Sequence, residues 1–521
     1  MQKNLQEKLG ASALLTPLTN SVIPPSNNPY PGSRVEKPLR RQPISSRWTV
    51  SGLTGAAAFI LFATAIFQIS CLFALASSPL PHVSPQMEKP EFWIKKISNP
   101  DRPLLAPEGI RKINEENLKR QDLYLCDVKS LREEWARDEL LALIEEDWQG
   151  FGDHTGPRYG KDGRLLDSAF WNGLRSAIPT ESLQNGAKVR FGLIVKRTDI
   201  RVFPTGEASL NGPNGGEFDR FQHSMVSPGS LVAVYFFSRD QRWAYSQVQF
   251  IRGWIRGEDI ALGKERDEAI AYHEREDRLV VTGSFIKVYG DASQQQVAFS
   301  TQMGSAYPIL DRSQRNASGR PIYVISIPSR ERDGQLSFRN GFVSQREDVH
   351  PGFLPYTQAN VARQAFKMLH EPYGWGELGG GRDCSRLIMD VFDSFGIVMP
   401  RNSKFQAMLG KSLGEVEGKT IDEKRKILDR APPFATVLRL PGHIMLYLGK
   451  HKGRHYVIHS LWATTRKGTS GATPARVSRV VVSDLSQGGS NPHESLLRRV
   501  TDIRYFGSDS TISDVITGSR R

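Results

Sequence analysis

Residues 379–396, GGGRDCSRLIMDVFDSFG, are the most informative segment of the chain. Apolar residues recur at helical spacing after Cys384, and Gly396 follows as a stop signal, so the stretch predicts an amphipathic helix that begins near the cysteine. A cysteine in the first helical turn lies at the positive end of the helix dipole, which favours the thiolate. Backbone N–H groups nearby could bind an oxyanion. The alternative is that Cys384 is a small buried apolar residue.

Two histidines downstream of this helix are brought together by an expected hairpin. Residues 443–449 (HIMLYLG) and 455–459 (HYVIH) read as two strands joined by a short polar loop. If the hairpin is symmetric about His451, His443 and His459 are cross-strand neighbours with Cβ atoms about 5 Å apart. One imidazole could then act as a base for the cysteine and the other as its orienting partner. A single histidine is more often a surface residue, and a bulge would break this register.

Four short motifs in the C-terminal part of the chain resemble the NlpC family of papain-like cysteine peptidases. They are Tyr373-Gly374-Trp375-Gly376, Asp383-Cys384-Ser385, Pro400-Arg401-Asn402-Ser403 and the strand from Gly442 to Gly449. The resemblance covers residues 355–507 and extends loosely back to residue 106. It implies a papain-like catalytic domain with a triad of Cys384, His443 and His459. It implies no metal and no organic cofactor.

The resemblance also implies a substrate and the residues that bind it. Such enzymes typically hydrolyse the bond between γ-D-glutamate and a diamino acid in the stem peptides of peptidoglycan. Members with attached SH3-like domains often require a free N-terminal L-alanine. Asp383 would face the ammonium group of that alanine, and Tyr245 of the first barrel would cap it. The side chains expected to bind substrate are Tyr373, Trp375, Asp383, Ser385, Arg401 and Tyr245.

Some alternatives stay open on the sequence. Asp383 could be only the N-cap of the helix, and Arg401 could be structural. The family usually has glycine after the Asp-Cys-Ser motif, whereas this chain has Arg386, which could crowd the cleft or bind a substrate carboxylate. The same residues would also serve a peptidoglycan amidase or acyltransferase. A non-catalytic wall-binding scaffold is a further alternative, and the intact triad argues against it.

Two β-rich blocks precede the C-terminal domain and repeat each other. Ile200-Arg201-Val202-Phe203 is repeated as Ile286-Lys287-Val288-Tyr289, and Gly253-Trp254-Ile255 as Gly341-Phe342-Val343. Short β-branched runs between Gly, Asp and Asn turns predict small barrels, which we place at 189–265 and 275–350. They resemble the bacterial SH3-type domains attached to wall hydrolases. The alternative is a pair of structural modules without a ligand.

The second barrel is joined to the C-terminal domain by a short proline-containing segment, residues 351–355. Such a connection should hold the barrel against the catalytic domain. There it would block long substrates and favour small stem peptides with a free amino end. The alternative is that the barrels only bind wall polymer and raise its local concentration.

The N-terminal part reads as a membrane-targeting region followed by a linker. Residues 1–47 are basic and rich in Pro, Ser and Asn, which predicts a disordered cytoplasmic tail. Residues 48–77 carry no charged side chain. They are long enough for a transmembrane helix, which takes about 20 residues, or for a signal peptide cleaved near Ala76. The basic flank predicts that the rest of the chain lies in the cell envelope, anchored to the inner membrane, or is secreted if the segment is cleaved. A Pro-rich linker is expected at 78–105.

Charge and cysteine usage restrict the remaining function classes. The formal net charge of +14 suits nucleic acid, an anionic membrane or an acidic wall polymer. No zinc-ligand spacing, RNA-binding signature or Walker-type loop supports nucleic acid. The three cysteines, Cys71, Cys126 and Cys384, lie far apart and indicate neither a disulfide framework nor a metal site. The expected partners are therefore peptidoglycan stem peptides and the cytoplasmic membrane.

The predicted fold class is α+β. In chain order we expect a transmembrane or signal segment, a small helical domain at 106–188, the two SH3-like barrels, the papain-like domain at 355–507 and a tail at 508–521.

Overall fold

The structure is a computed structural model that describes residues 80–468, 471–488 and 495–508. All of them belong to one compact unit that begins at Leu75. The tail at 1–47, the apolar segment at 48–77 and most of the C-terminal tail lie outside the described residues. Within the described ranges, no helix is both long enough and apolar enough to span a membrane.

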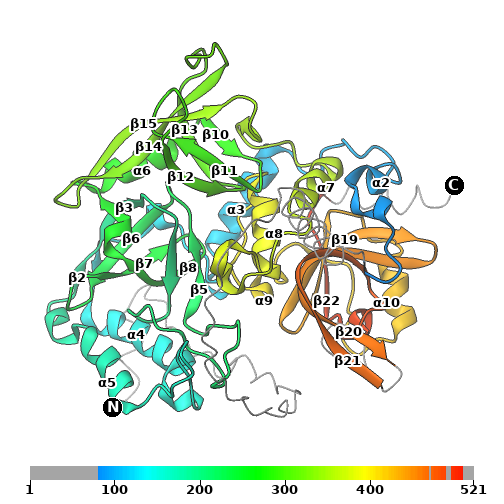
Figure 1. Ribbon diagram of the computed structural model, residues 1–521, viewed down its shortest axis with the longest axis horizontal. Helices are drawn as coiled ribbons and strands as arrows, with labels where there is room; N and C mark the ends of the chain where they lie inside the picture. Colours follow the sequence, from blue (N-terminus) through cyan, green and yellow to red (C-terminus); the bar gives the residue numbers. More distant parts are fainter. Residues whose placement is uncertain (1–79, 469–470, 489–494, 509–521) are drawn as a thin grey trace, which may run out of the picture. The chain divides into compact units, whose positions relative to one another are not determined.

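The main helices of the described chain lie mostly outside the two barrels (Figure 1). They are α2 (Pro90–Ile94), α3 (Pro107–Leu118), α4 (Arg137–Phe151), α5 (Ser168–Ala177), α6 (Arg266–Glu274), α7 (Gln358–Lys367), α8 (Cys384–Asp393), α9 (Ser403–Gln406), α10 (Ile421–Leu428) and α11 (Leu496–Arg499).

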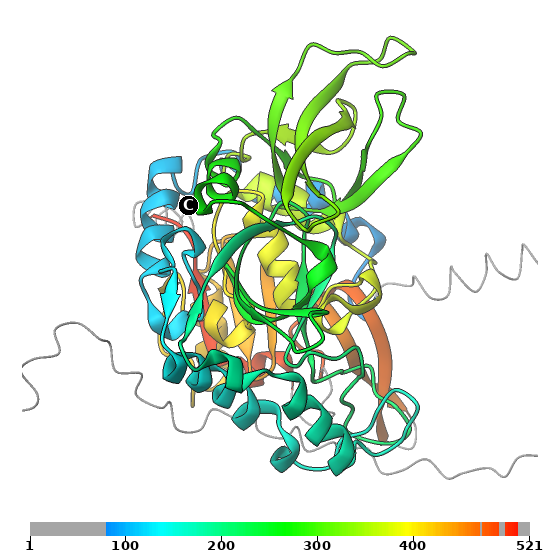
Figure 2. The same ribbon diagram turned by 90° about the vertical axis from the view of Figure 1, so that its left-hand side faces the viewer.

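The first barrel is a curled sheet of seven strands, seen as a ring in Figure 2. The strands are β3 (Arg190–Ile194), β4 (Thr198–Arg201), β5 (Gln222–Val226), β6 (Leu231–Phe237), β7 (Trp243–Val248), β8 (Ile251–Arg256) and β9 (Ile260–Leu262). Their spatial order is β5-β4-β8-β7-β6-β3-β9. Successive side chains of β6 enter different clusters, Val232 one core and Ala233 another, because strand residues alternate between faces. Both faces of the sheet are therefore buried.

The second barrel has the same topology. Its strands are β10 (Arg278–Val281), β11 (Phe285–Tyr289), β12 (Val297–Gln302), β13 (Ala306–Asp311), β14 (Ile322–Arg330), β15 (Leu336–Ser344) and β16 (Val349–Pro351). Their order, β12-β11-β15-β14-β13-β10-β16, matches the first barrel strand for strand. The repeated sequence segments lie on equivalent paired strands, with Arg201 opposite Trp254 and Tyr289 opposite Phe342. The internal repeat is confirmed.

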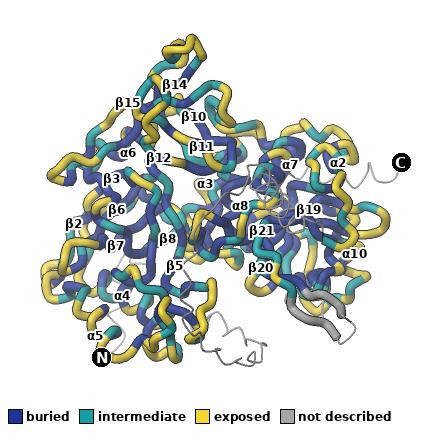
Figure 3. The backbone as a smooth tube through the Cα atoms, viewed as in Figure 1, coloured by how far each residue is buried: buried dark blue, intermediate teal, exposed yellow. Residues whose placement is uncertain are grey.

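The C-terminal domain is a six-stranded antiparallel sheet with helices on both faces. Its strands are β17 (Lys411–Ser412), β18 (Thr436–Leu440), β19 (His443–His451), β20 (Arg454–Gly468), β21 (Gly471–Asp484) and β22 (Asp502–Tyr505), in the order β17-β22-β18-β19-β20-β21. Ile444 and Leu446 of β19 share a core with the residues of α7 and α8. Met445 and Tyr447 share one with the residues of α10 and α11. These buried layers are dark blue in Figure 3.

The sequence predicts a linker at 78–105, whereas the structure packs its described part, residues 80–105, against the C-terminal domain. Trp93 is 1% exposed, donates its indole N–H to the Met87 carbonyl at 2.7 Å, and lies with its ring centroid 5.3 Å from that of Tyr456. Leu104 is also buried in the same core. The reason is that a proline-rich segment still folds against a domain when its apolar side chains have a surface to cover.

The expected helical region at 106–188 contributes to two different cores. Ile110 of α3 belongs to the core of the C-terminal domain. Trp148 of α4 and Trp171 of α5 instead belong to the core of the first barrel, where the Trp148 ring lies 4.4 Å from that of Phe203. A short pairing of β1 (Glu134–Trp135) with β2 (Ala187–Lys188) closes the region. Helices α4 and α5 thus support the barrel that stands beside the site.

Candidate active site

Cys384 is the first residue of α8, where the sequence predicts it. Asp383 is the N-cap, and its Oδ1 accepts a hydrogen bond from the Arg386 N–H at 2.8 Å. The helix then presents Leu387 and Ile388 to the core of the domain. Cys384 itself is 7% exposed. The cap fixes the start of the helix and so fixes the position of the thiol.

His443 and His459 meet, although not in the register that the sequence predicts. A hydrogen bond of 2.7 Å joins His443 Nε2 and His459 Nδ1. Leu446 is paired with Ile458, so continuing this register sets Met445 opposite His459 and leaves His443 diagonal to it. The symmetric hairpin is therefore wrong. A register shift between Tyr447 and Gly449 and a tighter turn displace the two strands.

A third side chain, Ser483 of β21, extends this hydrogen-bonded chain. Its Oγ lies 2.9 Å from His459 Nε2 and is fully buried. His459 is paired with Val481, so Ser483 lies two residues further along the same face of the neighbouring strand. Sequence analysis missed Ser483. The local sequence shows only that Ser483 follows the apolar run Val480-Val481-Val482. The pairing of β20 with β21 is needed to show that it meets His459.

The helix that carries the thiol is in direct contact with the strands that carry the histidines. The backbone N–H of Ile444, next to His443, lies near enough to the Cys384 sulfur to lower the pKa of its thiol, although burial raises that pKa more. Ser460, next to His459, donates its hydroxyl to the Arg382 carbonyl at 2.6 Å. Because each histidine has a neighbour bound to the Cys384 segment, the three predicted catalytic residues belong to one site.

Burial keeps the thiol and the imidazoles neutral. Burial, followed by the charge of Asp383, raises the pKa of Cys384 to about 12. Burial lowers the pKa of His443 to about 4 and that of His459 well below its usual value. The helix dipole is expected to favour the thiolate at Cys384, but the loss of hydration outweighs it here. The structure therefore holds a neutral thiol beside a neutral histidine pair.

This protonation state predicts how the free enzyme reacts with alkylating agents. Below a pKa of about 12 the thiolate fraction grows tenfold with each pH unit. Alkylation of Cys384 by iodoacetamide should therefore accelerate by about a hundredfold between pH 7 and pH 9. The measurement is the rate of mass gain on the Cys384 peptide, with the Cys126 peptide as internal control. A rate that stays flat from pH 5 to pH 8 would instead show a preformed thiolate–imidazolium pair.

Asp383 and Ser385 are held in a buried hydrogen-bonded group with Arg401. Arg401 donates Nη2 to Asp383 Oδ2 at 2.6 Å and Nη1 to Asp383 Oδ1 at 3.1 Å and to Ser385 Oγ at 2.8 Å. It also donates Nε to Ser224 Oγ of the first barrel at 2.7 Å. Asp383 accepts a further bond from the Gly376 N–H at 3.1 Å. Both oxygens of Asp383 therefore have partners within the protein.

Four aromatic rings form a wall between the first barrel and the C-terminal domain. The ring centroid of Phe218, in the long loop between β4 and β5, lies 5.2 Å from that of Trp375, 6.2 Å from Tyr373 and 5.0 Å from Trp462. Trp375 also donates its indole N–H to the Asp219 carbonyl at 2.8 Å. Tyr373 lies near enough to Cys384 for the charge of a thiolate to raise the pKa of its hydroxyl, after burial as the larger cause. The predicted residue Tyr373 thus lies beside the thiol, and Trp375 joins it through their shared contact with Phe218.

Tyr245 does not lie at this site. It is fully buried in the core of the first barrel, its hydroxyl donates to Asp147 Oδ2 at 2.5 Å, and Arg252 Nε donates to that hydroxyl at 2.8 Å. The assignment of Tyr245 as a cap for a substrate amine is wrong, because its side chain points at α4. The barrel residue that reaches the catalytic domain is Phe218, from a loop rather than a strand.

Glu377 joins both barrels to the catalytic domain. It lies in the turn Trp375–Gly380 and is 0% exposed. Its carboxylate accepts hydrogen bonds from Ser224 Oγ (2.6 Å), Met225 N (3.0 Å) and Arg197 Nη2 (3.1 Å) of the first barrel and from Gln302 Nε2 (3.1 Å) of the second. Burial would raise the pKa of Glu377, but the surrounding guanidinium groups, Arg386 first, hold it at about 2. A buried carboxylate with this set of partners fixes the barrels on the catalytic domain.

Arg386, where the family usually has glycine, points into the same buried group. Its Nε donates to Asp390 Oδ1 at 2.6 Å, and its Nη1 lies 3.4 Å from Glu377 Oε2. Arg382 also donates Nε to Asp390 at 2.5 Å. The side chain is 5% exposed. Arg386 is thus bound to carboxylates of the protein.

Family comparisons agree with this geometry. A model of the NlpC/P60 family matches residues 370–469, which include the whole triad. The C-terminal domain is an NlpC/P60 domain. A model of an SH3 domain of the SH3b1 type matches residues 209–256, within the first barrel. These matches confirm the predicted combination of an NlpC-type domain with an SH3-like domain. Comparison with curated proteins gave no match.

A solved structure shows the same fold. An NlpC/P60 endopeptidase from Photobacterium damselae subsp. piscicida is 18% identical, with a TM-score of 0.63 over 79% of this chain and 96% of that chain. An NlpC/P60 family protein from Bacillus cereus ATCC 10987 is 14% identical, with a TM-score of 0.43 over 61% of this chain and 100% of that chain. The first likeness extends the shared fold well beyond the NlpC/P60 domain.

The chemistry available at the site is nucleophilic. In the described part of the chain, no group of three or more His, Cys, Asp or Glu side chains is arranged to hold a metal ion. Acyl transfer through a covalent intermediate needs a nucleophile and an oriented base. The thiol at the helix N-terminus suits the first role, and the buried histidine, with one ring nitrogen bound to its partner, suits the second.

Proposed function

We propose that the protein is a cysteine endopeptidase that cleaves the bond between γ-D-glutamate and the diamino acid of peptidoglycan stem peptides. The observation that carries the proposal is the hydrogen bond from His443 Nε2 to His459 Nδ1, made beside the strand residue that contacts Cys384. This bond leaves His443 Nδ1 for the thiol. The resemblance of the Cys384 and His443 motifs to NlpC peptidases supplies the substrate class.

The proposed first step is acylation of the thiol. His443 Nδ1 takes the proton from Cys384 as its sulfur attacks the γ-carbonyl carbon of the glutamyl residue, and a C–S bond forms. His459 Nδ1 accepts the Nε2–H of His443, and Ser483 accepts the Nε2–H of His459, so the hydrogen-bonded chain selects the required tautomer. Backbone N–H groups at the start of α8 and the Tyr373 hydroxyl are suited to bind the oxyanion.

Acylation ends with release of the amine, and hydrolysis of the thioester is the proposed second step. Protonated His443 gives its proton to the departing amine of the diamino acid, and the C–N bond breaks. A water molecule then gives a proton to His443 and attacks the thioester carbonyl. The C–S bond breaks, and protonated His443 returns its proton to the leaving sulfur, which restores the Cys384 thiol and the neutral imidazole. The γ-carboxylic acid loses its proton to solvent and leaves as the carboxylate. Because the imidazole is neutral before each attack, it can act as a base twice.

We further propose that the cleft accepts stem peptides with a free N-terminal L-alanine. Asp383 lies next to the thiol, where Arg401 holds both its oxygens, and the aromatic rings of Phe218, Tyr373 and Trp375 lie along the proposed approach to it. Phe218 belongs to the first barrel, so that barrel would stop a stem that continues into glycan. A carboxylate flanked by aromatic faces suits an ammonium group.

The cell envelope is the proposed place of action. The uncharged segment at 48–77 and the basic residues before it support a membrane anchor with the catalytic part outside the cytoplasm, or a secreted protein if the segment is cleaved.

Product analysis on defined stem peptides tests the proposed bond. Incubation of L-Ala-γ-D-Glu-diaminopimelate-D-Ala should release L-Ala-γ-D-Glu, identified by mass spectrometry, and N-acetylation of the alanine should slow the reaction by about tenfold or more. An amidase would instead release intact stems from N-acetylmuramyl peptide, and a non-catalytic scaffold would leave both substrates unchanged. Equal rates on free and acetylated peptides would contradict the proposed requirement for an amino end.

A further inference from the structure

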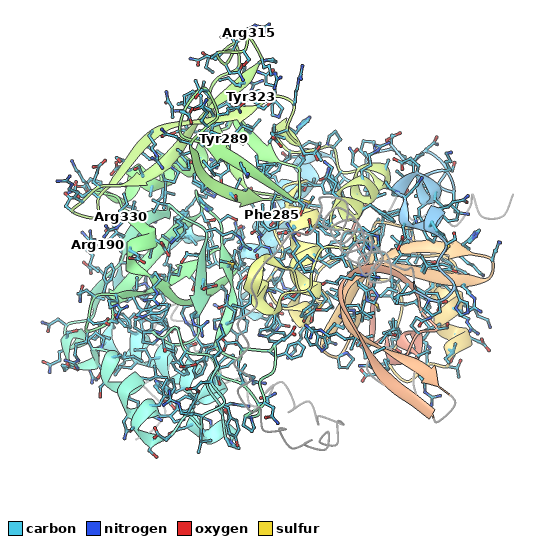
Figure 4. All side chains as sticks on the ribbon, viewed as in Figure 1. Arg190, Phe285, Tyr289, Arg315, Tyr323 and Arg330 are labelled. Atoms are coloured by element: carbon cyan, nitrogen blue, oxygen red, sulfur yellow. The ribbon has the colours of Figure 1, made fainter. Side chains whose placement is uncertain are left out.

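A cavity between the two barrels lies apart from the catalytic site. Its volume is about 450 Å³, within the usual range for small-molecule sites. Its lining residues come from the two barrels and none from the NlpC/P60 domain. Figure 4 shows Arg190 of the first barrel and Arg330 of the second at this junction.

The residues that line the cavity carry more positive than negative charges. Four arginines, Arg190, Arg242, Arg256 and Arg330, share it with two acidic residues, Glu258 and Asp333. In the ranges that the structure describes, none of the four guanidinium groups lies within 4.0 Å of a carboxylate oxygen. Elsewhere in the same barrels arginines are paired, as Arg201 is with Asp219 at 2.9 Å. Like charges gathered in one cavity repel each other, so an anionic ligand would stabilise the arrangement.

Two of the arginines are already oriented. The guanidinium group of Arg256 stacks over the Trp243 ring at 4.0 Å. Arg330 donates Nε to the Ile260 carbonyl at 3.0 Å, which leaves its two Nη groups for another acceptor. The Leu262 N–H also donates to the Gly334 carbonyl at 3.0 Å, so the two barrels are joined at the wall of the cavity. These two held guanidinium groups require little reorganisation on binding.

We propose that this cavity binds a phosphate group carried on a hydroxyl-rich molecule, a polyol or sugar phosphate. A phosphate monoester offers close to two charges and three strong acceptor oxygens, which match the surplus of guanidinium donors. Glu258 and Asp333 would accept hydrogen bonds from the hydroxyl groups of the same molecule. The cavity is too large for inorganic phosphate alone, and its acidic residues disfavour a ligand that is anionic throughout. A phosphate group on a polyol is found both in free polyol phosphates and in the headgroups of polyol phospholipids, so either could supply the ligand.

Two binding measurements on the full chain test the proposal and separate these sources. The probes are glycerol 3-phosphate, followed by calorimetry at low salt, and phosphatidylglycerol vesicles, followed by sedimentation. Glycerol and phosphatidylcholine vesicles are the uncharged and zwitterionic controls. Saturable binding of glycerol 3-phosphate supports a free ligand, and binding of the vesicles alone supports a lipid headgroup. In either case Arg190→Gln and Arg242→Gln should each weaken binding about tenfold.

Arg315→Gln is the matched control, because it removes the same charge from the second barrel at a position remote from the cavity (Figure 4). It should bind like the wild-type protein, and all three variants should keep wild-type hydrolysis and thermal unfolding. Arg190→Lys, which keeps the charge but loses the fork, should fall between wild type and Arg190→Gln. Absence of binding to both probes, or an equal loss in Arg315→Gln, would overturn the proposed site.

Discussion

Replacing Cys384 with alanine is expected to reduce hydrolysis of stem peptides by about 10⁴-fold or more. The thiol is the proposed nucleophile at the start of α8, and the neighbouring Ser385 hydroxyl is bound to Asp383 and Arg401. Removing a nucleophile from a catalytic group of this kind leaves only binding and oxyanion stabilisation. The side chain is 7% exposed and belongs to the core of the domain, but the substitution removes only one sulfur atom, so the fold and substrate binding should persist. The measurement is initial rate by chromatography, with circular dichroism and a binding assay on the same preparation.

Cys126→Ala is the matched control for this change. Burial raises the pKa of Cys126 to about 12, and the residue packs against the core of the first barrel, so its replacement should leave the rate within about twofold of wild type. His443→Ala should approach the loss seen for Cys384→Ala. A Cys384→Ala protein that cleaves stem peptides at the wild-type rate would refute the proposed peptidase mechanism.

The second large effect is expected on stability. Glu377→Ala should lower the free energy of unfolding by about 3–5 kcal/mol, because it leaves Arg197 and Arg386 buried without their shared carboxylate. Since Glu377 bonds both barrels to the catalytic domain, its replacement should also let the barrels separate from that domain more easily. Urea unfolding followed by Trp fluorescence, together with limited proteolysis between the barrels and the catalytic domain, measures the two effects.

The charge of Glu377 also predicts a pH dependence. Its pKa falls from 4.5 to about 2 in the folded protein, so its contribution to stability is present above pH 4.5 and is lost as the pH falls toward 2. Glu331→Ala, on an exposed turn of the second barrel, is the matched control and should change stability by less than about 0.5 kcal/mol. A Glu377→Ala protein as stable as this control would show that the barrels are held by other contacts.

The sequence predicts best where structure depends on neighbours along the chain. The start of α8 at Cys384 follows from a capping aspartate, a preceding glycine run and helical periodicity, all local signals. The two barrels follow from short repeated strands bounded by turn residues, although the repeated segments themselves pair at long range, β4 with β8 and β11 with β15. The meeting of His443 and His459 was predicted for a partly wrong reason, because the register shift after Tyr447 cannot be read from the alternation of residues.

Long-range partners were not predictable in the same way. Ser483 reaches His459 only through the pairing of two long strands, and Glu377 gains its partners from three parts of the chain. Tyr245 was assigned to the cleft because an aromatic residue in a barrel strand fits the family pattern. The direction of its side chain depends on the packing of α4, which the local sequence does not encode. Arg386 differs, because its carboxylate partners lie one helical turn along α8 and in the turn Trp375–Gly380 just before the helix, but the local sequence does not show that its side chain is buried.

The central claim is that Cys384 becomes acylated by the γ-glutamyl part of the substrate. An activated ester of L-Ala-γ-D-Glu should acylate the enzyme faster than the thioester is hydrolysed, so the intermediate accumulates in a burst. Acid quenching and mass spectrometry of the digested protein should then find one acyl group per chain, on the peptide that contains Cys384. An acyl group on any other residue, or an undiminished burst in the Cys384→Ala protein, would contradict the account.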